Sequence, residues 1–293
     1  MRSALRAPQT DEVDDAVLAA FRGQHPGLRL PPVVIVIAAY NEAGLPRVLH
    51  SLPREVCGLP AEVLVVDDGS SDGTSSAVPA AGRGLLAACP VNRGQGRALR
   101  LGYRIAREHG ASYIVTTDAD GQYSPAEVAE VLSPVVGGRA DFVTGSRRLG
   151  MVEHQDTVRR AGTYVFAWLA SLLLGRRITD TSFGLRAMRA EVTEAVTLDQ
   201  PQYQASELLI GVFAHGFRYA EVPGTMRVRS AGSTKKGGNL VYGWRYARVM
   251  LGTWWREGRP RARAGGSAGG GCYGPPSRPL TRSREAGKEP EVV

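Results

Sequence analysis

Residues Tyr113-Ile114-Val115-Thr116-Thr117-Asp118-Ala119-Asp120-Gly121-Gln122 join an apolar run to two closely spaced carboxylates. The β-branched and aromatic first half is typical of a strand buried on both faces. Asp118 and Asp120 then follow the carboxyl end of that strand, where open α/β sheets bind their ligands. Two such carboxylates repel unless a cation lies between them, and Mg²⁺ or Mn²⁺ is commonly shared between carboxylates and substrate phosphates. The pattern therefore favours a metal that binds a nucleoside diphosphate, with a plain polar turn as the alternative.

The sequence on either side alternates between strand and helix patterns. Apolar runs predict strands at residues 33–38, 62–66, 113–117 and 141–144. Helical patterns lie between them, at residues 45–52, after the Gly/Ser-rich turn beyond residue 68, at 96–109 and at 125–132. This order predicts an α/β fold with a mainly parallel, Rossmann-like sheet covered by helices on both faces.

The remaining sequence divides the chain into three expected regions. Residues 1–32 hold a short helix and a proline-containing linker, and residues 33–255 form the main domain. Its second half contains helix patterns at 162–174, 206–215 and 240–255 and a strand pattern at 219–222. The basic tail of residues 256–293 is rich in Gly, Pro, Arg and Ser, so we expect it to be disordered because it cannot bury enough apolar surface.

Composition excludes several classes of protein. A chain of 293 residues with 43% hydrophobic and 22% charged residues is typical of a soluble globular protein. We find no apolar stretch long enough to span a bilayer and no signal-peptide core, which predicts a cytoplasmic protein. Its three cysteines show no metal-ligand or disulfide spacing. The net charge of +8 suits an anionic ligand or anionic lipid headgroups, and no motif indicates binding to nucleic acid.

Polar loops follow three consecutive predicted strands, at residues 39–42, 67–74 and 118–120. Because the carboxyl ends of parallel strands meet at one edge of a sheet, these loops should gather several carboxylates and the ring of Tyr40 in one crevice. A nucleoside supplies N–H and hydroxyl donors to such carboxylates, and a metal supplies positive charge. The three loops together therefore predict a nucleotide site, although each one alone could be a simple turn.

These motifs, in this order, resemble family 2 glycosyltransferases of GT-A fold. They continue with Gly145-Ser146-Arg147 and with the loop Arg229-Ser230-Ala231-Gly232-Ser233-Thr234-Lys235. That loop resembles the R-x-x-G-x-S-K pattern of the dolichol- and polyprenyl-phosphate mannose synthases, with Thr234 in place of the serine. The similarity extends over about residues 33–250, so the resemblance implies a GT-A domain with a C-terminal amphipathic helix.

The resemblance also implies roles for individual residues in binding the donor. Tyr40 and Glu42 would hold the nucleoside, and Val66 and Asp68 would lie against base and ribose. The segment from Asp118 through Ala119 to Asp120 would bind the diphosphate through Mg²⁺ or Mn²⁺. Gln122 matches a residue close to the metal in some members of the family.

Three basic residues would meet the phosphates of donor and acceptor. By the resemblance these are Arg147, Arg229 and Lys235, which with Asp120 form the expected catalytic set. Guanidinium groups bind phosphate in a bidentate manner, which supports the role of Arg147 independently. Asp180 and Glu207 are further carboxylates that could either act in catalysis or orient these basic residues. The segment Asn92-Arg93-Gly94-Gln95-Gly96 suggests either a backbone close to phosphate or a simple helix start.

The implied reaction transfers a hexose from a nucleotide sugar, with GDP-mannose favoured, to a polyprenyl monophosphate with inversion at the anomeric carbon. No general base is expected, because a phosphate monoester with a second pKa near ~6 is already ionised at neutral pH. Two alternatives remain: a UDP-sugar enzyme acting on a hydroxyl acceptor, and a dinucleotide-binding oxidoreductase.

A lipid acceptor predicts a peripheral protein at the inner face of the cell membrane. The aromatic residues of segments 162–174 and 240–255 are candidates for contact with the membrane surface. Ordinary core packing is the alternative for both segments and the favoured interpretation for the first.

Overall fold

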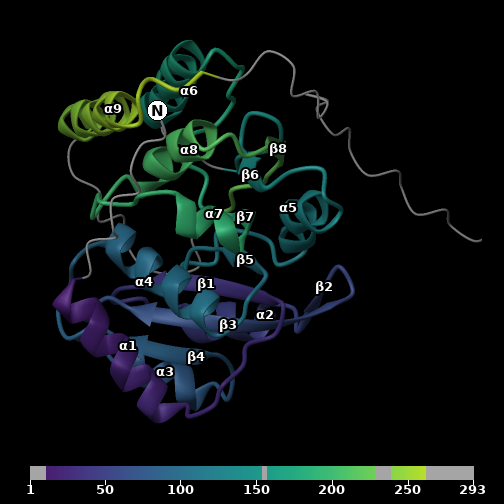
Figure 1. The fold of residues 1–293 in the computed structure, drawn as a ribbon, viewed down its shortest axis with the longest axis vertical. Coiled ribbons are helices and arrows are strands. Elements are labelled where there is room, and N and C mark those ends of the chain that lie inside the picture. Colours follow the sequence, from purple (N-terminus) through teal and green to yellow (C-terminus); the bar gives the residue numbers. More distant parts are fainter. Residues whose placement is uncertain (1–10, 154–156, 229–238, 262–293) are drawn as a thin grey trace, which may run out of the picture.

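Figure 1 shows the computed structural model, which describes residues 11–153, 157–228 and 239–261. Within these residues the strands form one eight-stranded sheet in the order β2-β3-β1-β5-β7-β6-β8, and β4 pairs with β3. The strands are β1 (Val33–Ala39), β2 (Glu55–Val56), β3 (Leu59–Asp67), β4 (Leu85–Ala88), β5 (Tyr113–Thr116), β6 (Phe142–Ser146), β7 (Arg186–Arg189) and β8 (Tyr219–Pro223).

The sheet is mainly parallel, as predicted. Strand β1 is parallel to β3 and β5, β3 is parallel to β4, and β6 is parallel to β8. Strand β7 is antiparallel to both of its neighbours, β5 and β6, and the short β2 is antiparallel to β3. The carboxyl ends of β1, β3, β5, β6 and β8 therefore share one edge of the sheet, and β7 begins at that same edge.

Helices cover both faces of the sheet, which confirms the predicted architecture (Figure 1). One face packs against α1 (Glu12–Gln24), α4 (Gln95–Glu108), α6 (Thr157–Leu174), α7 (Ala190–Ala195), α8 (Gln204–Ala214) and α9 (Asn239–Arg256). The other face packs against α2 (Leu45–Ser51), α3 (Thr74–Ala80) and α5 (Glu127–Val136). Strand β1 shows why: Val34 and Val36 face the first layer, whereas Ile35 and Ile37 face the second.

Both terminal helices are integrated into the first layer. Helix α1 contributes Val17, Leu18 and Phe21 to the same core cluster as α4. Helix α9 still includes Arg256, where we expected the tail to begin, and the Arg256 guanidinium donates to Glu207 on α8 at 2.9 Å. This contact pairs Glu207 with Arg256, which is none of the basic residues that we expected Glu207 to orient. Residues 262–293 of the expected disordered tail lie outside the described residues.

Candidate active site

Strand order brings the predicted loops side by side. Along the sheet edge the structure places the loop after β3, then those after β1 and β5, then the segment before β7, and finally the loops after β6 and β8. The predicted donor-binding residues occupy the first three of these loops, and Arg147 follows β6. Since β7 runs antiparallel, the segment that contains Asp180 leads into this edge as well.

Backbone amides of the loop after β1 donate hydrogen bonds to side-chain hydroxyls of the segment after β3. The Asn41 amide donates to Ser70 Oγ at 2.8 Å, and the Glu42 amide donates to Thr74 Oγ1 at 2.9 Å. Asn41 has a φ of 51°, a left-handed conformation that Asn tolerates better than most residues. These contacts fix the backbone on both sides of Asn41, so Tyr40 and Glu42 are held beside the β3 loop, each half-buried.

The two aspartates that end β3 are satisfied inside the protein. Asp67 accepts from the Ser75 hydroxyl on α3 and, within its own loop, from the Ser70 amide at 3.1 Å. Asp68 accepts the backbone N–H of Arg93 at 2.9 Å and that of Gly94 at 2.7 Å. Burial raises the pKa of Asp68, although these two N–H groups oppose the shift. The Asn92–Gly96 segment is therefore a helix start whose backbone amides bind a carboxylate of the protein.

Two predicted ligand residues have their side chains in the core. Val66 is fully buried and packs against α4, where a Cβ at Gly102 would lie 3.0 Å from Val66 Cγ2. Ala119 is also buried, in the cluster on the opposite face of the sheet. A nucleotide could meet only the backbone of these two residues.

Asp118 faces the segment before β7. The carboxylate is half-buried and accepts from Gln95 Nε2 at 3.2 Å. A Cβ at Gly184 would lie 2.5 Å from Asp118 Oδ2, so only glycine fits there without displacing the carboxylate. The Gly184 amide donates to the Tyr123 hydroxyl at 2.9 Å. Burial, and secondarily the charge of Asp118, raises the pKa of Tyr123 well above its ordinary value, so the phenol stays protonated.

Asp120 and Gln122 connect the carboxylate loop to the segment after β8. Asp120 is buried, and its Oδ1 accepts the Gln122 amide at 3.1 Å. Gln122 Nε2 donates to the Arg227 carbonyl at 3.0 Å, and the Arg227 amide donates to the Gln122 carbonyl at 2.9 Å. This pair of bonds anchors the chain two residues before the basic loop. Arg229 and Lys235 themselves lie outside the described residues.

The donor set at Asp118 and Asp120 fits a hard divalent ion. Within the described ranges no group of three or more His, Cys, Asp or Glu side chains could hold a metal by itself. Mg²⁺ usually binds proteins through one or two carboxylates and takes its other ligands from water and phosphate. Two carboxylates at the edge of the sheet match that requirement. The amide nitrogen of Gln122 is used by Arg227, so a metal contact from Gln122 would have to come from Oε1.

Arg147 is held by Asp180. Its guanidinium makes a bidentate pair with this fully buried carboxylate, Nε at 2.7 Å and Nη2 at 2.8 Å. Nη2 also donates to Ser182 Oγ at 2.6 Å. Although burial disfavours the charge, Asp180 raises the pKa of Arg147 above its ordinary value. Asp180 thus orients a basic residue, one of the two roles considered for it, and a phosphate contact by Arg147 stays a prediction.

Sequence reasoning missed the packing role of Phe183. Its ring lies under the edge of the sheet, where a Cβ at Gly145 would lie 2.2 Å from it and one at Gly224 would lie 2.5 Å from it. The ring also contacts Tyr123, with centroids 4.7 Å apart. The signal was present as an aromatic residue inside a polar loop. The Phe183 ring packs the loop after β5, the end of β6 and the loop after β8 against one another.

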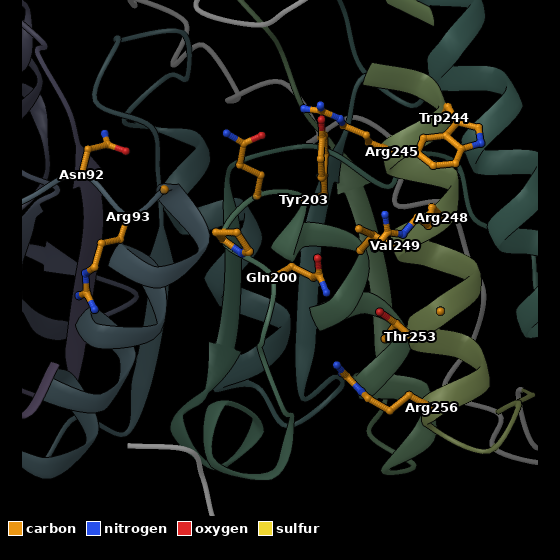
Figure 2. Close-up of a pocket in the computed structure, with 14 residues that line it drawn as sticks. Asn92, Arg93, Gln200, Tyr203, Trp244, Arg245, Arg248, Val249, Thr253 and Arg256 are labelled. Atoms are coloured by element: carbon orange, nitrogen blue, oxygen red, sulfur yellow. The ribbon is translucent and has the colours of Figure 1, made fainter. Parts of the chain in front are cut away.

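A cavity of about 900 Å³ borders the site between the Asn92–Gly94 segment, the segment before α8 and helix α9 (Figure 2). Gln200 and Tyr203 line one wall, and Arg245 and Arg248 on α9 line another. Both arginines are exposed, and none of the ion pairs found within the described residues involves either of them. The cavity therefore presents positive charge next to the amides that bind Asp68.

Helices α6 and α9 lie together at one end of the molecule (Figure 1) and expose part of their aromatic residues. Trp168 on α6 and Trp255 on α9 are 65% and 67% exposed. Phe166 and Tyr246 instead pack against each other with centroids 4.6 Å apart. Each helix therefore has a core-packed side and an exposed aromatic side. Among the described residues we find no helix with the length and apolarity needed to cross a membrane.

This sheet, with carboxylates after β1, β3 and β5 and a two-aspartate loop at its edge, has the arrangement that we expected of a GT-A glycosyltransferase. Comparison with known sequences gives the family. The chain belongs to glycosyl transferase family 2, whose sequence model matches residues 34–197. It is therefore a glycosyltransferase, as the motifs predicted, and the oxidoreductase alternative is excluded.

Two relatives and one solved structure show what the chain is similar to. Undecaprenyl-phosphate mannosyltransferase of Micrococcus luteus is 31% identical over 220 residues, 71% of this chain and 89% of the relative. Polyprenol monophosphomannose synthase of Mycolicibacterium smegmatis is 32% identical over 247 residues, 78% of this chain and 89% of the relative. Glucosyl-3-phosphoglycerate synthase of Mycobacterium tuberculosis, crystallised with Mn²⁺ and UDP, superposes with a TM-score of 0.58 at 21% identity over 88% of each chain. The last similarity confirms the GT-A fold.

Proposed function

We propose that this enzyme transfers a hexose from a nucleotide sugar, with GDP-mannose favoured, to a polyprenyl or dolichyl monophosphate with inversion. The observation that carries this proposal is the double hydrogen bond between Gln122 and Arg227. It anchors the chain two residues before the basic loop to the Asp118–Asp120 segment, which supports a role of that loop in bringing a second anion to the donor diphosphate. The names of the two relatives, both polyprenyl-phosphate mannosyltransferases, support this acceptor and sugar.

Asp118 and Asp120 would hold Mg²⁺ or Mn²⁺, with Gln122 as a further ligand. Bound there, the ion would neutralise the negative charge of the diphosphate leaving group. The protein contributes by fixing both carboxylates: Gly184 leaves room for Asp118, and the Gln122 amide orients Asp120.

The basic residues would position the acceptor. Arg229 and Lys235 would direct the acceptor phosphate oxygen towards the anomeric carbon, and Arg147 would stabilise charge on the departing diphosphate. A lipid monophosphate needs no general base. In support of base-free transfer, Asp68 and Asp180 are already bound by protein N–H donors.

We place the reaction at the inner surface of the cell membrane. Trp168 and Trp255 would lie at headgroup depth, where Trp is favoured. Arg259 lies over the Trp255 ring at 4.7 Å, a pairing suited to anionic headgroups. The test is flotation with anionic liposomes: a Trp168→Ala/Trp255→Ala variant should lose binding, and the matched control Val91→Ala, at another exposed apolar residue, should keep it. Equal flotation of both variants would contradict this placement.

The reaction itself is tested by incubating the enzyme with GDP-mannose, UDP-glucose or UDP-N-acetylglucosamine, with Mg²⁺ or Mn²⁺. Each donor is offered with polyprenyl phosphate or with a soluble hydroxyl acceptor, and lipid products are measured by mass spectrometry. We expect hexosyl-phosphoryl-polyprenol, lost on adding EDTA and in Asp120→Asn. Glu191→Gln, which removes an exposed carboxylate on α7, is the matched control. Transfer to the hydroxyl acceptor alone would overturn the proposal in favour of the UDP-sugar alternative.

A further inference from the structure

We propose that Asp14, on helix α1, is a positioning residue for the nucleotide site, acting through Arg93 on Asp68. This inference rests on the proposed donor site at the edge of the sheet. It gives a role to a helix that precedes the segment matched by the family model, which begins at residue 34.

Asp14 is buried between two arginines. Its Oδ1 accepts from Arg93 Nη2 at 2.5 Å, and its Oδ2 accepts from Arg100 Nη2 at 2.7 Å. Asp11 adds a second carboxylate 3.0 Å from Arg93 Nη1. The hydrogen bond to Asp14 raises the pKa of Arg93 although burial opposes it, so the pair is firmly ionic.

The backbone of the same arginine reaches the donor site. The Arg93 and Gly94 amides donate to the two oxygens of Asp68, at 2.9 and 2.7 Å. Asp68 follows directly on β3, beside the loop that holds Glu42. Two N–H donors orient the buried carboxylate and oppose the rise that burial causes in its pKa. The contacts therefore run from α1 through the side chain of Arg93 to its backbone and on to Asp68.

The loop between β4 and α4 has little room to absorb a shift of Arg93. Gly94 has a φ of 98°, and a Cβ there would lie 2.5 Å from the Pro201 carbonyl oxygen. On the other side, a Cβ at Gly69 would lie 2.5 Å from the Val91 carbonyl carbon. Because the backbone is enclosed on both sides, an Arg93 side chain that loses one of its two carboxylate partners should disturb the two amides rather than relax independently.

Arg100 extends the same contact to the opposite wall of the cavity. Besides its pair with Asp14, its Nη1 donates to the Leu198 carbonyl at 3.3 Å, two residues before the cavity wall that begins at Gln200. Asp14 therefore holds both the Asn92–Gly94 segment and the segment that faces it.

The experiment compares Asp14→Asn with Asp15→Asn. Asp15 lies on the same helix and pairs with Arg104 at 2.6 Å, but Arg104 has no part in the β4–α4 loop, so this variant is a matched control. We expect Asp14→Asn to raise the donor KM and the Kd of the nucleoside diphosphate about tenfold, equivalent to one weakened ionic hydrogen bond, with kcat within about twofold. Asp15→Asn should leave all three constants unchanged. In an Arg93→Gln background, Asp14→Asn should raise the Kd of the nucleoside diphosphate by much less than tenfold, because only the contact of Asp14 with Arg100 is left to lose.

Amide hydrogen exchange provides a readout that does not depend on activity. Asp14→Asn should accelerate exchange of the Arg93 and Gly94 amides, while the β1 amides, which report global stability, stay protected. Unchanged exchange at these two amides, or an equal effect of Asp15→Asn, would overturn the inference. If the wild type bound no nucleoside diphosphate, the proposed function would fail, and the exchange experiment would still decide whether Asp14 holds the donors of Asp68.

Discussion

Replacing Asp180 with Asn should destabilise the enzyme strongly, because it leaves the charge of Arg147 uncompensated in a buried place. Asp180 is fully buried, and the Arg147 side chain is only 10% exposed. The carboxylate accepts Nε and Nη2 of Arg147 and the amide of Ser182. Asn keeps the shape of the side chain but turns one acceptor into a donor that faces the guanidinium.

Removing one partner of a buried ion pair lowers the free energy of unfolding by about 3–5 kcal/mol. Because Arg147 is slightly exposed, we expect a loss of about 3 kcal/mol, at the lower end of this range. For a chain of 293 residues, an unfolding entropy of about 2.1 cal/mol/K per residue converts that loss into a fall of about 5 °C in Tm. Urea denaturation followed by circular dichroism measures the loss, with the m-value as a check that the denatured state is unchanged.

Glu191→Gln is the matched control, since Arg189 and Glu191 form an exposed ion pair, 43% and 54% exposed. Its loss should stay below about 1 kcal/mol. An Asp180→Asn variant that loses no more free energy of unfolding than Glu191→Gln would refute the reasoning. It would mean that water or another group already compensates Arg147.

Two further predictions concern the site, and a third concerns an ion pair at the amino ends of β6 and β8. Gly184→Ala should weaken Mn²⁺-dependent nucleotide binding about tenfold by displacing Asp118, and calorimetry showing wild-type Kd would contradict this. Gln122→Leu removes both the side-chain bond to the segment that leads into the basic loop and the proposed Oε1 contact with the metal, so steady-state kinetics should show a raised KM for polyprenyl phosphate as well as for the donor. The hydrogen bond from Arg218 lowers the pKa of Asp141 below its ordinary value of 3.8, so the pair stabilises the fold above that pH and loses its effect as the pH falls further. The stability difference between wild type and Asp141→Asn should therefore shrink in acid, and a constant difference from pH 7 to pH 2 would count against the pairing.

The central strands could be predicted because each is buried on both faces and reads as a continuous apolar run. Strand β7 could not, since its four residues begin and end with arginine. Arg186 is buried in spite of its charge, and no periodicity reveals a buried arginine. Strand β4 could not be predicted either, because its sequence Leu-Leu-Ala-Ala holds no β-branched or aromatic residue and suits a helix equally well.

The site could be predicted as a set of loops but not as a set of contacts. The order of motifs placed the carboxylates of Asp68 and Asp118 at one edge, and the structure confirms that edge. The order of motifs could not show that Asp68 accepts hydrogen bonds from the Arg93 and Gly94 amides, 25 and 26 residues further along the chain. The sequence also could not show which of two neighbouring tryptophans is exposed. Trp254 donates to the Leu173 carbonyl whereas Trp255 is exposed, and only tertiary packing distinguishes them.

The partners of helix α1 lie far along the chain, which has a consequence for biosynthesis. Asp14 pairs with Arg93, which lies 79 residues further along the chain, and Asp15 pairs with Arg104, which lies 89 residues further along. At about 5–20 residues per second, the ribosome needs about 4–16 s to produce the 79 residues from Asp14 to Arg93. A 13-residue helix is marginal alone in water, so the nascent segment should remain unstructured during this interval. Helix α1 would then dock only once α4 has been made, after strands β1 and β3, which precede α4 in the chain.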